Sequence, residues 1–432
     1  MASTYLSRSQ SSSNQQIFTI STWVKRADFP ANSYITNIAS DGNNRFGIIW
    51  QAGTLSIYSL TAGIQDIFLN TSAQFRDVSA WYHIVLKIDT TQATASDRAK
   101  LYVNGTQITS FASADYPTQN LNFPTNNTHY IGCFLASNQS FNFSGSMSHY
   151  HYTDGYAYDA STFGEFDAQN VWKPKTAPSV TYGTNGFFLK FANAGSLGTD
   201  SSGNGNDFTV NGTGTQTLDT PSNVFATMNP LDHIKGTFTN GNLAMECVTD
   251  AGDSSTRGTL AFTKGKWYWE AKYTAFTGTG ATATFIGIQD TSTAIATSGA
   301  TNGYWYNAEV GTIAHNGTNI VTGLSTFSAG NIVGVGYDAD NGDLYLWTNG
   351  VAENSGNPVV TGIDTNTTWS PFFCIHYGAS NTSQLFPNFG NGYYGTTAVS
   401  TPNADGDGYG KFEYSVPTGY YALCTKNIQT YG

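Results

Sequence analysis

Oxygen-bearing side chains recur at alternate positions in the stretch 403–408, which reads NADGDG. Calcium prefers oxygen ligands, and calcium loops supply them at alternate positions together with a glycine at a sharp turn. Asn403, Asp405 and Asp407 are therefore candidate calcium ligands. However, the loop begins with Asn, and Tyr414 stands where a calcium loop carries its final Glu. These departures favour an acidic turn without metal, and calcium stays the alternative.

Two carboxylates, Glu165 and Asp167, are the nearest approach to a hydrolytic pair, because glycoside hydrolysis requires two such groups facing one sugar bond. No second Glu follows at the expected spacing, and the segment is turn-like, so a solvated loop pair is the favoured interpretation. His149 and His151 alternate on a predicted strand, but a metal site requires three or four ligands. We expect a polar sheet face there, and no enzymatic activity.

Tyrosine and tryptophan gather in two stretches that could bind a ligand. Tyr150 and Tyr152 belong to the first, and Tyr304, Trp305 and Tyr306 form the second. A flat apolar ring with a polar edge suits contact with carbohydrate or protein. Strand alternation would direct half of such rings into a core, although the flanking glycine and asparagine favour a loop for the second stretch. All five are candidate ligand-binding residues.

The charge and the termini narrow the possible partners. The 432 residues carry a formal net charge of −11 and no cluster of Lys and Arg, which argues against nucleic acid as a partner. No apolar run is long enough to cross a membrane, and the N-terminal stretch lacks the apolar centre of a secretory signal. We therefore expect synthesis in a cytoplasm without membrane insertion. The widely spaced Cys133, Cys247, Cys374 and Cys424 are expected to be buried thiols outside any disulfide or metal site.

The composition is typical of an all-β protein with many tight turns, since 11% of the residues are charged, 14% are aromatic and 46 are glycine. Alternating, strand-like runs follow one another at short intervals in the first half, which is the rhythm of a sandwich or barrel. No sustained helical period is present, and at most 160–166 forms a helical turn. The predicted strands of the first half are 18–24, 45–50, 54–59, 81–89, 100–104, 130–134 and 144–152.

The stretch Asn331–Gly350 predicts strand, turn, strand and turn. Its first strand leads to Asn341-Gly342, and Asn-Gly is the strongest short hairpin signal because a type I′ turn requires positive φ at both central residues. A second Asn-Gly pair closes the stretch, and a shorter copy lies at Lys100–Gly105. We interpret each copy as the mark of one antiparallel β domain.

Four motifs occur in the first half, in the order FTISTWVKR, WYHIVLKID, KLYVNG and FNFSGSMSHYHY. On these motifs the first half resembles the laminin G-like, concanavalin A-like jelly-roll family, which implies a two-sheet sandwich with a sugar or protein partner at an edge or concave face. In many members a hydrophobic strand followed by DSSGNGND precedes the first motif, whereas here it follows the last one. We hypothesise a circularly permuted domain in which Phe187–Phe191 and Phe208–Val210 return to complete the sheets.

The second half contains GKWYWE, FIGI, the hairpin 331–350, WSPFF and PNFG in that order. It resembles a SPRY domain, which implies a second β-sandwich that binds partners through surface loops without catalysis. The predicted fold class is therefore all-β, with two tandem antiparallel β-sandwiches: a laminin G/concanavalin A-like jelly roll at 1–218, an ordered connector at 219–235 and a SPRY-like sandwich at 236–432. Two prolines argue against regular structure in the connector.

The order of the two modules, together with DTPSNVFATMNPLD and the terminal ALCTKNI, resembles a group of tailed-bacteriophage virion proteins. The resemblance implies a surface protein of the virion, such as a tail or head fibre, with other virion proteins as partners and a homo-oligomer, a trimer being the favoured state. We expect multivalent, non-enzymatic adhesion to a host envelope glycan or protein through sandwich loops. A capsid or tail decoration protein with purely structural contacts is the alternative, and a glycan depolymerase is disfavoured.

Overall fold

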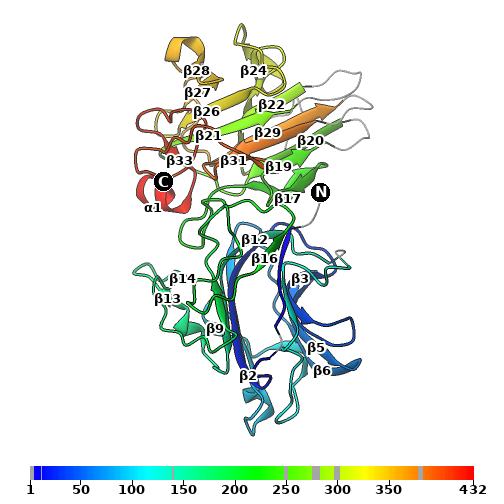
Figure 1. Ribbon diagram of the computed structural model, residues 1–432. Coiled ribbons are helices and arrows are strands. Elements are labelled where there is room, and N and C mark those ends of the chain that lie inside the picture. Colours follow the sequence, from blue (N-terminus) through cyan, green and yellow to red (C-terminus); the bar gives the residue numbers. More distant parts are fainter. Residues whose placement is uncertain are drawn as a thin grey trace. The chain divides into compact units, whose positions relative to one another are not determined.

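The chain divides into two compact units, Met1–Gln216 and Thr217–Gly432. Each is built almost entirely from antiparallel β-sheet (Figure 1), which confirms the predicted all-β class. The computed structural model describes residues 4–10, 12–138, 141–247, 252–274, 283–295, 302–377 and 383–432.

Two sheets face each other in the first unit. One has, among the described residues, the spatial order β10 (Phe111–Asp115), β6 (Ile64–Thr71), β5 (Thr54–Thr61), β4 (Arg45–Gln51), β3 (Ser33–Ala39), β11 (Thr128–Ile131), β1 (Tyr5–Arg8) and β16 (Thr209–Asn211). The other runs β15 (Phe187–Leu189), β12 (Gly145–Asp154), β2 (Ile17–Arg26), β7 (Trp81–Asp89), β8 (Ala99–Val103) and β9 (Thr106–Gln107). A separate ribbon pairs β13 (Gly164–Phe166) with β14 (Trp172–Pro174), and single 3-10 turns form η1 (Ala95–Asp97) and η2 (Ala160–Thr162).

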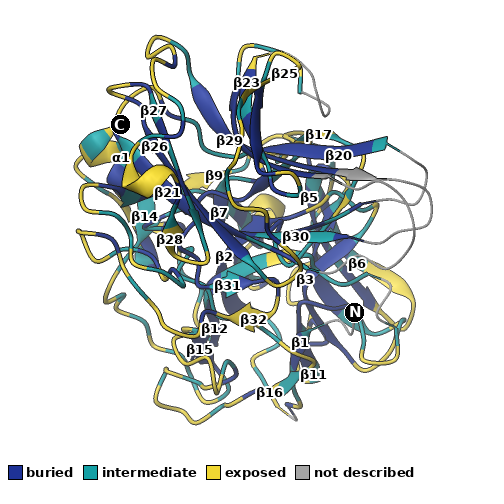
Figure 2. Ribbon diagram, turned by 90° about the horizontal axis from the view of Figure 1, so that it is seen from above, coloured by how far each residue is buried: buried dark blue, intermediate teal, exposed yellow. Residues whose placement is uncertain are grey.

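Strand alternation sorts the side chains of this sandwich into a core and an outer face. Phe46, Ile48 and Trp50 on β4 are fully buried and share one apolar cluster with Ile84 and Leu86 of β7 in the opposite sheet. Figure 2 shows the strands mostly buried and the connecting loops mostly exposed. The residues between the core positions of β4 therefore point to the other side of the sheet.

The pairing that circular permutation requires is present in the first unit. β15 pairs with β12, where Phe187 lies opposite Tyr152, and β16 pairs with β1. The DSSGNGND motif supports β15, because the Asp200 carboxylate accepts a hydrogen bond from the backbone N–H of Phe188 at 2.8 Å. The segment that follows the last family motif thus completes both sheets.

The second unit is also made of two larger sheets. One runs β17 (Met228–Ile234), β20 (Gly252–Gly258), β29 (Trp369–Tyr377), β22 (Ala283–Asp290), β23 (Gly303–Asn307), β24 (Thr312–His315) and β25 (Thr318–Val321). The other runs β18 (Thr237–Thr239), β19 (Ala244–Glu246), β30 (Gln384–Asn388), β21 (Lys266–Tyr273), β26 (Ile332–Asp338), β27 (Asp343–Thr348) and β28 (Val351–Ala352), with β33 (Tyr421–Ala422) parallel to β21. A ribbon of β31 (Tyr393–Tyr394) and β32 (Thr397–Ala398), the 3-10 turn η3 (Glu353–Gly356) and helix α1 (Thr425–Tyr431) complete it.

The predicted hairpin is β26–β27, but its turn differs from the prediction. Asp338 pairs with Asp343, so the loop has four residues, and of the pair Asn341-Gly342 only Gly342 has positive φ. The Asp338 carboxylate accepts the backbone N–H groups of Asp340 and Asn341 at 3.1 Å each, and this local bonding replaces type I′ geometry. The closing Asn349-Gly350 has positive φ at both residues, as a type I′ turn requires.

The connector is more regular than its prolines suggested. Pro230 lies within β17, an edge strand with an irregular register between Met228 and His233, and edges and bulges are where a sheet tolerates proline. Phe225 and Met228 of this segment are buried within the second unit.

The short helix α1 escaped prediction, because seven residues are too few to show a helical period. Nothing helical in the described part of the chain has the length and hydropathy to span a bilayer. All four cysteines are buried and outside any disulfide, which confirms the expectation from their spacing.

Candidate functional site

A groove of about 450 Å³ lies on the outer face of the large sheet of the first unit. This volume falls within the range of about 300–1,000 Å³ that is usual for small-ligand sites. Half of the lining side chains are aromatic, one is charged, and none is a carboxylate. The groove is lined by Asn32, Tyr34, Arg45, Ile49, Gln51, Tyr58, Gln65, Phe68, Phe134 and Phe141.

The alternation of β4 and β5 positions the floor of the groove. Arg45, Ile49 and Gln51 occupy the β4 positions opposite the core side chains, and Tyr58 does the same on β5. Gly47 lies between them, and a Cβ atom there would come within 3.1 Å of the Tyr34 ring. The missing side chain thus leaves room for an aromatic ring above the sheet.

The wall of the groove comes from the segment that follows β11. The Asn37 side chain donates to the backbone carbonyl of Phe134 at 2.5 Å, and the backbone N–H of Tyr34 donates to the carbonyl of Phe141 at 2.9 Å. Ser33 Oγ donates to the carbonyl of Asn142 at 3.1 Å. These bonds hold Phe134 and Phe141 over β3.

The rings are packed against one another and against Arg45. Tyr34 and Phe134 have ring centroids 4.9 Å apart, and Tyr58 meets the edge of Phe68 at 6.0 Å. The Arg45 guanidinium lies 5.2 Å from the Tyr58 centroid and 5.0 Å from that of Phe134. Burial raises the pKa of the Tyr34 hydroxyl, and the positive charge of Arg45 opposes that shift. The groove is thus an apolar, preformed surface with one cation in it.

Polar groups form part of its rim. Gln51 Nε2 donates to Asn32 Oδ1 at 3.4 Å, and Ser56 Oγ donates to Gln51 Oε1 at 2.7 Å. Gln65 is exposed and donates to Asp115 at 3.0 Å. Amides held in this way at the border of an aromatic surface can fix the orientation of a ligand rich in hydroxyl groups.

Tyr150 and Tyr152, which the sequence offered as surface contacts, lie in the core of the first unit instead. Both are almost fully buried, and both rings stack on Phe187. The Tyr150 hydroxyl donates to Thr36 Oγ1 at 2.9 Å. The prediction was wrong for them because alternation along β12, which is interrupted by a bulge between Ser148 and His151, turns both rings inward.

The second aromatic stretch is a strand and not a loop. Trp305 and Tyr306 on β23 are fully buried, because Tyr306 belongs to the main apolar core of the second unit and Trp305 packs with Phe372 in a separate apolar cluster. Tyr304 is half-buried and stacks on His315, with centroids 4.2 Å apart. The structure therefore leaves only the Tyr304 ring partly accessible among these three candidates.

The candidate calcium loop is a hydrogen-bonded turn. Asp405 is buried, and each of its carboxylate oxygens accepts two protein N–H donors, among them the backbone of Ala422 and the side chain of Asn427. Asn403 directs its amide N–H groups to backbone carbonyls, and Asp407 accepts the hydroxyl of Tyr431. Asp405 thereby anchors the C-terminal segment, and this structural role explains the acidic loop better than calcium does.

Glu165 and Asp167, the carboxylate pair of the first unit, do not line the groove. Glu165 is exposed on β13, and Asp167 forms an ion pair with Lys173 at 2.6 Å. Asp167 also accepts the backbone N–H groups of Gln169 and Val171. The hydrogen bond from Lys173, followed by these backbone bonds, lowers the pKa of the Asp167 carboxyl. Asp167 thus closes the turn of the β13–β14 ribbon.

Ser21 and His83 are 2.9 Å apart and resemble a nucleophile and its base. However, Trp172 Nε1 can only donate, so His83 Nδ1 must accept from it at 2.9 Å and Nε2 must carry the proton. A base for Ser21 would need a bare Nε2. Both residues are fully buried, and burial lowers the pKa of His83 to about 3. His151 is buried too, stacked on Phe188, and is not part of an exposed polar face.

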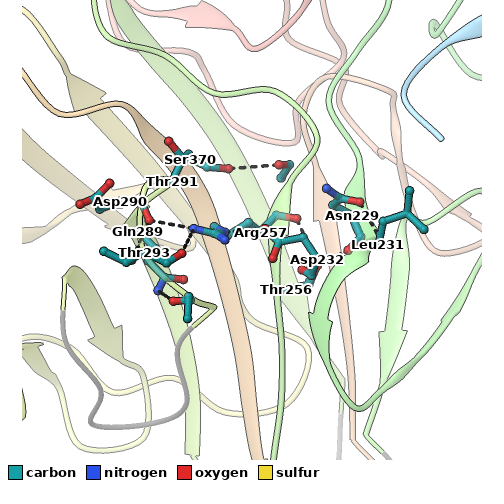
Figure 3. Close-up of polar contacts among 12 residues, drawn as sticks. Asn229, Leu231, Asp232, Thr256, Arg257, Gln289, Asp290, Thr291, Thr293 and Ser370 are labelled. Atoms are coloured by element: carbon teal, nitrogen blue, oxygen red, sulfur yellow. Dashed lines mark hydrogen bonds and ion pairs between the residues drawn. The ribbon is translucent and has the colours of Figure 1, made fainter. Parts of the chain in front are cut away.

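Figure 3 shows a dense polar cluster in the second unit around Arg257. Its Nε pairs with Asp232 at 2.7 Å, and one Nη donates to the carbonyls of Asp290 and Thr293 at 2.8 and 3.1 Å. Thr256 Oγ1 donates to the carbonyl of Asn229 at 3.0 Å. These contacts tie β17 to β20 and to the end of β22, so the cluster is structural.

Reasoning from sequence found the strands of the groove but not the groove itself. Arg45–Trp50 and Thr54–Ser59 were predicted as strands, and Arg45 and Tyr58 stand at the alternate positions that face away from a core. Outward-facing residues on two consecutive, paired strands are neighbours in space, so this rule predicts that Arg45 and Tyr58 lie on the same face of the sheet. Nothing local signals that Phe134 and Phe141 fold back over them.

Comparisons with known proteins give one family match within the first unit and several similar solved structures. Residues 2–155 match the model of the concanavalin A-like lectin/glucanases superfamily. Among solved structures, the chain is similar to the SPRY domain of human HERC1, with 17% identity, 37% of this chain and 96% of that chain covered, and a TM-score of 0.33. The chain is also similar to a heptameric SAP-like pentraxin from Limulus polyphemus, with 15% identity, 36% of this chain and 72% of that chain covered, and a TM-score of 0.29. A third similar structure is the PSpry domain of TRIM65, with 13% identity, 37% of this chain and 91% of that chain covered, and a TM-score of 0.28. No curated protein matches the chain.

Proposed function

We propose that this chain is a non-enzymatic binding protein that holds a glycan in the aromatic groove of its first unit. The observation that carries the proposal is the set of five aromatic side chains that line the groove together with Arg45, in a lining that contains no carboxylate. Sugar rings present apolar C–H faces that pack on aromatic rings, and their hydroxyl groups suit the amides of Gln51 and Gln65.

The same lining argues against hydrolysis. A glycosidase requires two carboxyl groups on either side of the bond that it breaks, and the ten lining residues supply none. The match to a superfamily named for lectins and glucanases is compatible with either activity. The residues of the groove therefore favour the lectin-like alternative.

The proposed setting is the surface of a virion, with several copies presented together so that weak contacts add up. Support comes from the resemblance of the whole sequence to tailed-phage virion proteins. Immunogold labelling of intact particles and analytical ultracentrifugation of the purified protein test the location and the trimer. A protein that labels particles and binds no glycan would be a decoration protein.

Binding to a glycan array and to host cells tests the groove. Tyr58→Ala and Phe141→Ala should weaken binding about tenfold, the effect of losing one well-packed contact residue of about 1.4 kcal/mol. Tyr156→Ala is the matched control, because Tyr156 is a 40% exposed tyrosine of the same unit outside the groove. Equal binding by all three variants would refute the proposed site.

A further inference from the structure

Arg45 differs from the other partly buried arginines of the chain. Its Nε atom is buried and has no hydrogen-bond partner, and no ion pair of the described residues includes it. By contrast, the guanidinium groups of Arg26, Arg98 and Arg257 donate to backbone carbonyls, and Arg8 donates to side-chain amides. A guanidinium held in a groove without an acceptor lacks its usual compensation for lost hydration.

The surroundings of Arg45 hold it in place without neutralising it. Aromatic rings of Tyr58 and Phe134 lie about 5 Å from its central carbon, and such stacking uses the faces of the guanidinium while its N–H groups stay in the plane. It is the one charged residue among the ten that line the groove. In a chain of net charge −11, an isolated cation in an apolar groove favours an anion over a neutral group.

We infer that the groove selects acidic glycans, and that Arg45 is the specificity-determining residue that binds the carboxylate of a uronic acid or other sugar acid. The inference rests on the proposed glycan-binding function and adds the chemical class of the ligand. A planar carboxylate matches the planar fork of a guanidinium through two parallel hydrogen bonds. The aromatic rings on either side would then pack against the apolar face of the same sugar.

Calorimetric titration of the full chain with oligogalacturonate and with its fully methyl-esterified form tests this. The two probes share one backbone, and only the first carries carboxylates. We expect the acidic form to bind at least tenfold more tightly, and this preference to weaken as salt is added. Arg45→Gln should abolish the preference, and Arg45→Lys should restore it in part, because lysine keeps the charge and loses the fork.

Lys190→Gln is the matched charge control, since Lys190 is an exposed cation of the same unit outside the groove. It should leave both affinities unchanged. Circular dichroism establishes that each variant is folded. The effect of salt on the preference of the wild-type protein for the acidic probe tests the inference without any variant.

The possible outcomes distinguish the role of Arg45 in selecting acidic glycans from glycan binding itself. Equal affinity for the two probes, or a preference that survives in Arg45→Gln, would overturn the role of Arg45 and leave glycan binding standing. Stronger binding of dextran sulfate or of an acidic peptide than of oligogalacturonate would overturn the assignment of a sugar carboxylate. Absence of binding to any glycan would refute the proposed function and the inference together.

Discussion

Mild acid should destabilise the first unit through three buried histidines, His83, His129 and His151. Burial holds the pKa of His83 and of His129 at about 3, against an ordinary 6.5, and holds that of His151 well below 6.5. His83 accepts the Trp172 indole N–H, and His151 stacks on Phe188 with centroids 3.8 Å apart. All three are thus neutral in the folded protein at pH values where the unfolded chain binds protons.

The sign and the size of the effect follow from this difference. Between pH 6.5 and about 3 the unfolded state binds more protons, so the free energy of unfolding falls as the pH falls through that window. His83 and His129 each contribute about 1.4 kcal/mol per pH unit, which amounts to about 2 kcal/mol each at pH 5, and His151 adds a loss of the same sign. Aspartates with lowered pKa values, such as Asp167 and Asp338, reduce the free energy of unfolding only as the pH approaches their ordinary 3.8, which is below the pH 5 at which the measurement ends.

Urea unfolding of the full chain between pH 7.5 and 5 measures how steeply the free energy of unfolding changes with pH. Hydrogen exchange of peptides from each unit then shows which unit loses stability. Positive charge on Arg8 and Lys190 and the neighbouring His149 add to the shifts, so ionic strength is kept constant. His129→Gln should reduce the slope by about 1.4 kcal/mol per pH unit. A free energy of unfolding that stays constant from pH 6.5 to 5, or a loss confined to the second unit, would contradict a role for the buried histidines.

Three further predictions concern stability and reactivity. Arg257→Met should lower the free energy of unfolding by about 2–3 kcal/mol, because the carbonyls of Asp290 and Thr293 lose a charged donor. The ion pair with the half-exposed Asp232 adds little to this loss. Chemical denaturation measures the change, and a loss below about 0.5 kcal/mol would contradict the prediction. Gly105→Ala should lower the free energy of unfolding by at least about 1 kcal/mol more than Gly203→Ala does. Both glycines have positive φ, but a Cβ atom at Gly105 would lie 2.8 Å from the Trp172 ring, whereas one at Gly203 would have no neighbour within 4 Å. The four thiols should react with Ellman's reagent only after unfolding, because all are buried and burial raises the pKa of Cys133 to about 12; fast reaction of the native protein would show that the chain opens.

Local pattern predicted the strands well, because a two-residue period and tight-turn chemistry are properties of short segments. WYHIVLKID became β7 with the predicted bounds, and the Asn-Gly pairs at 104–105 and 349–350 have the positive φ values of type I′ turns. The pair at 341–342 differs because Asp338 captures the backbone of its own loop. Such competition depends on the register of the two strands, which the dipeptide does not reveal.

The all-β class and the two antiparallel sandwiches could be predicted from the sequence alone, since both rest on residues close together in the chain. The tertiary structure decided which aromatic residues are available to a ligand. It buried Tyr150, Tyr152, Trp305 and Tyr306, and it formed a groove around Arg45 from positions as far apart in the sequence as Asn32 and Phe141. Successive side chains of a strand point to opposite faces of the sheet, which the sequence pattern predicts. Which face becomes the core depends on where the second sheet packs.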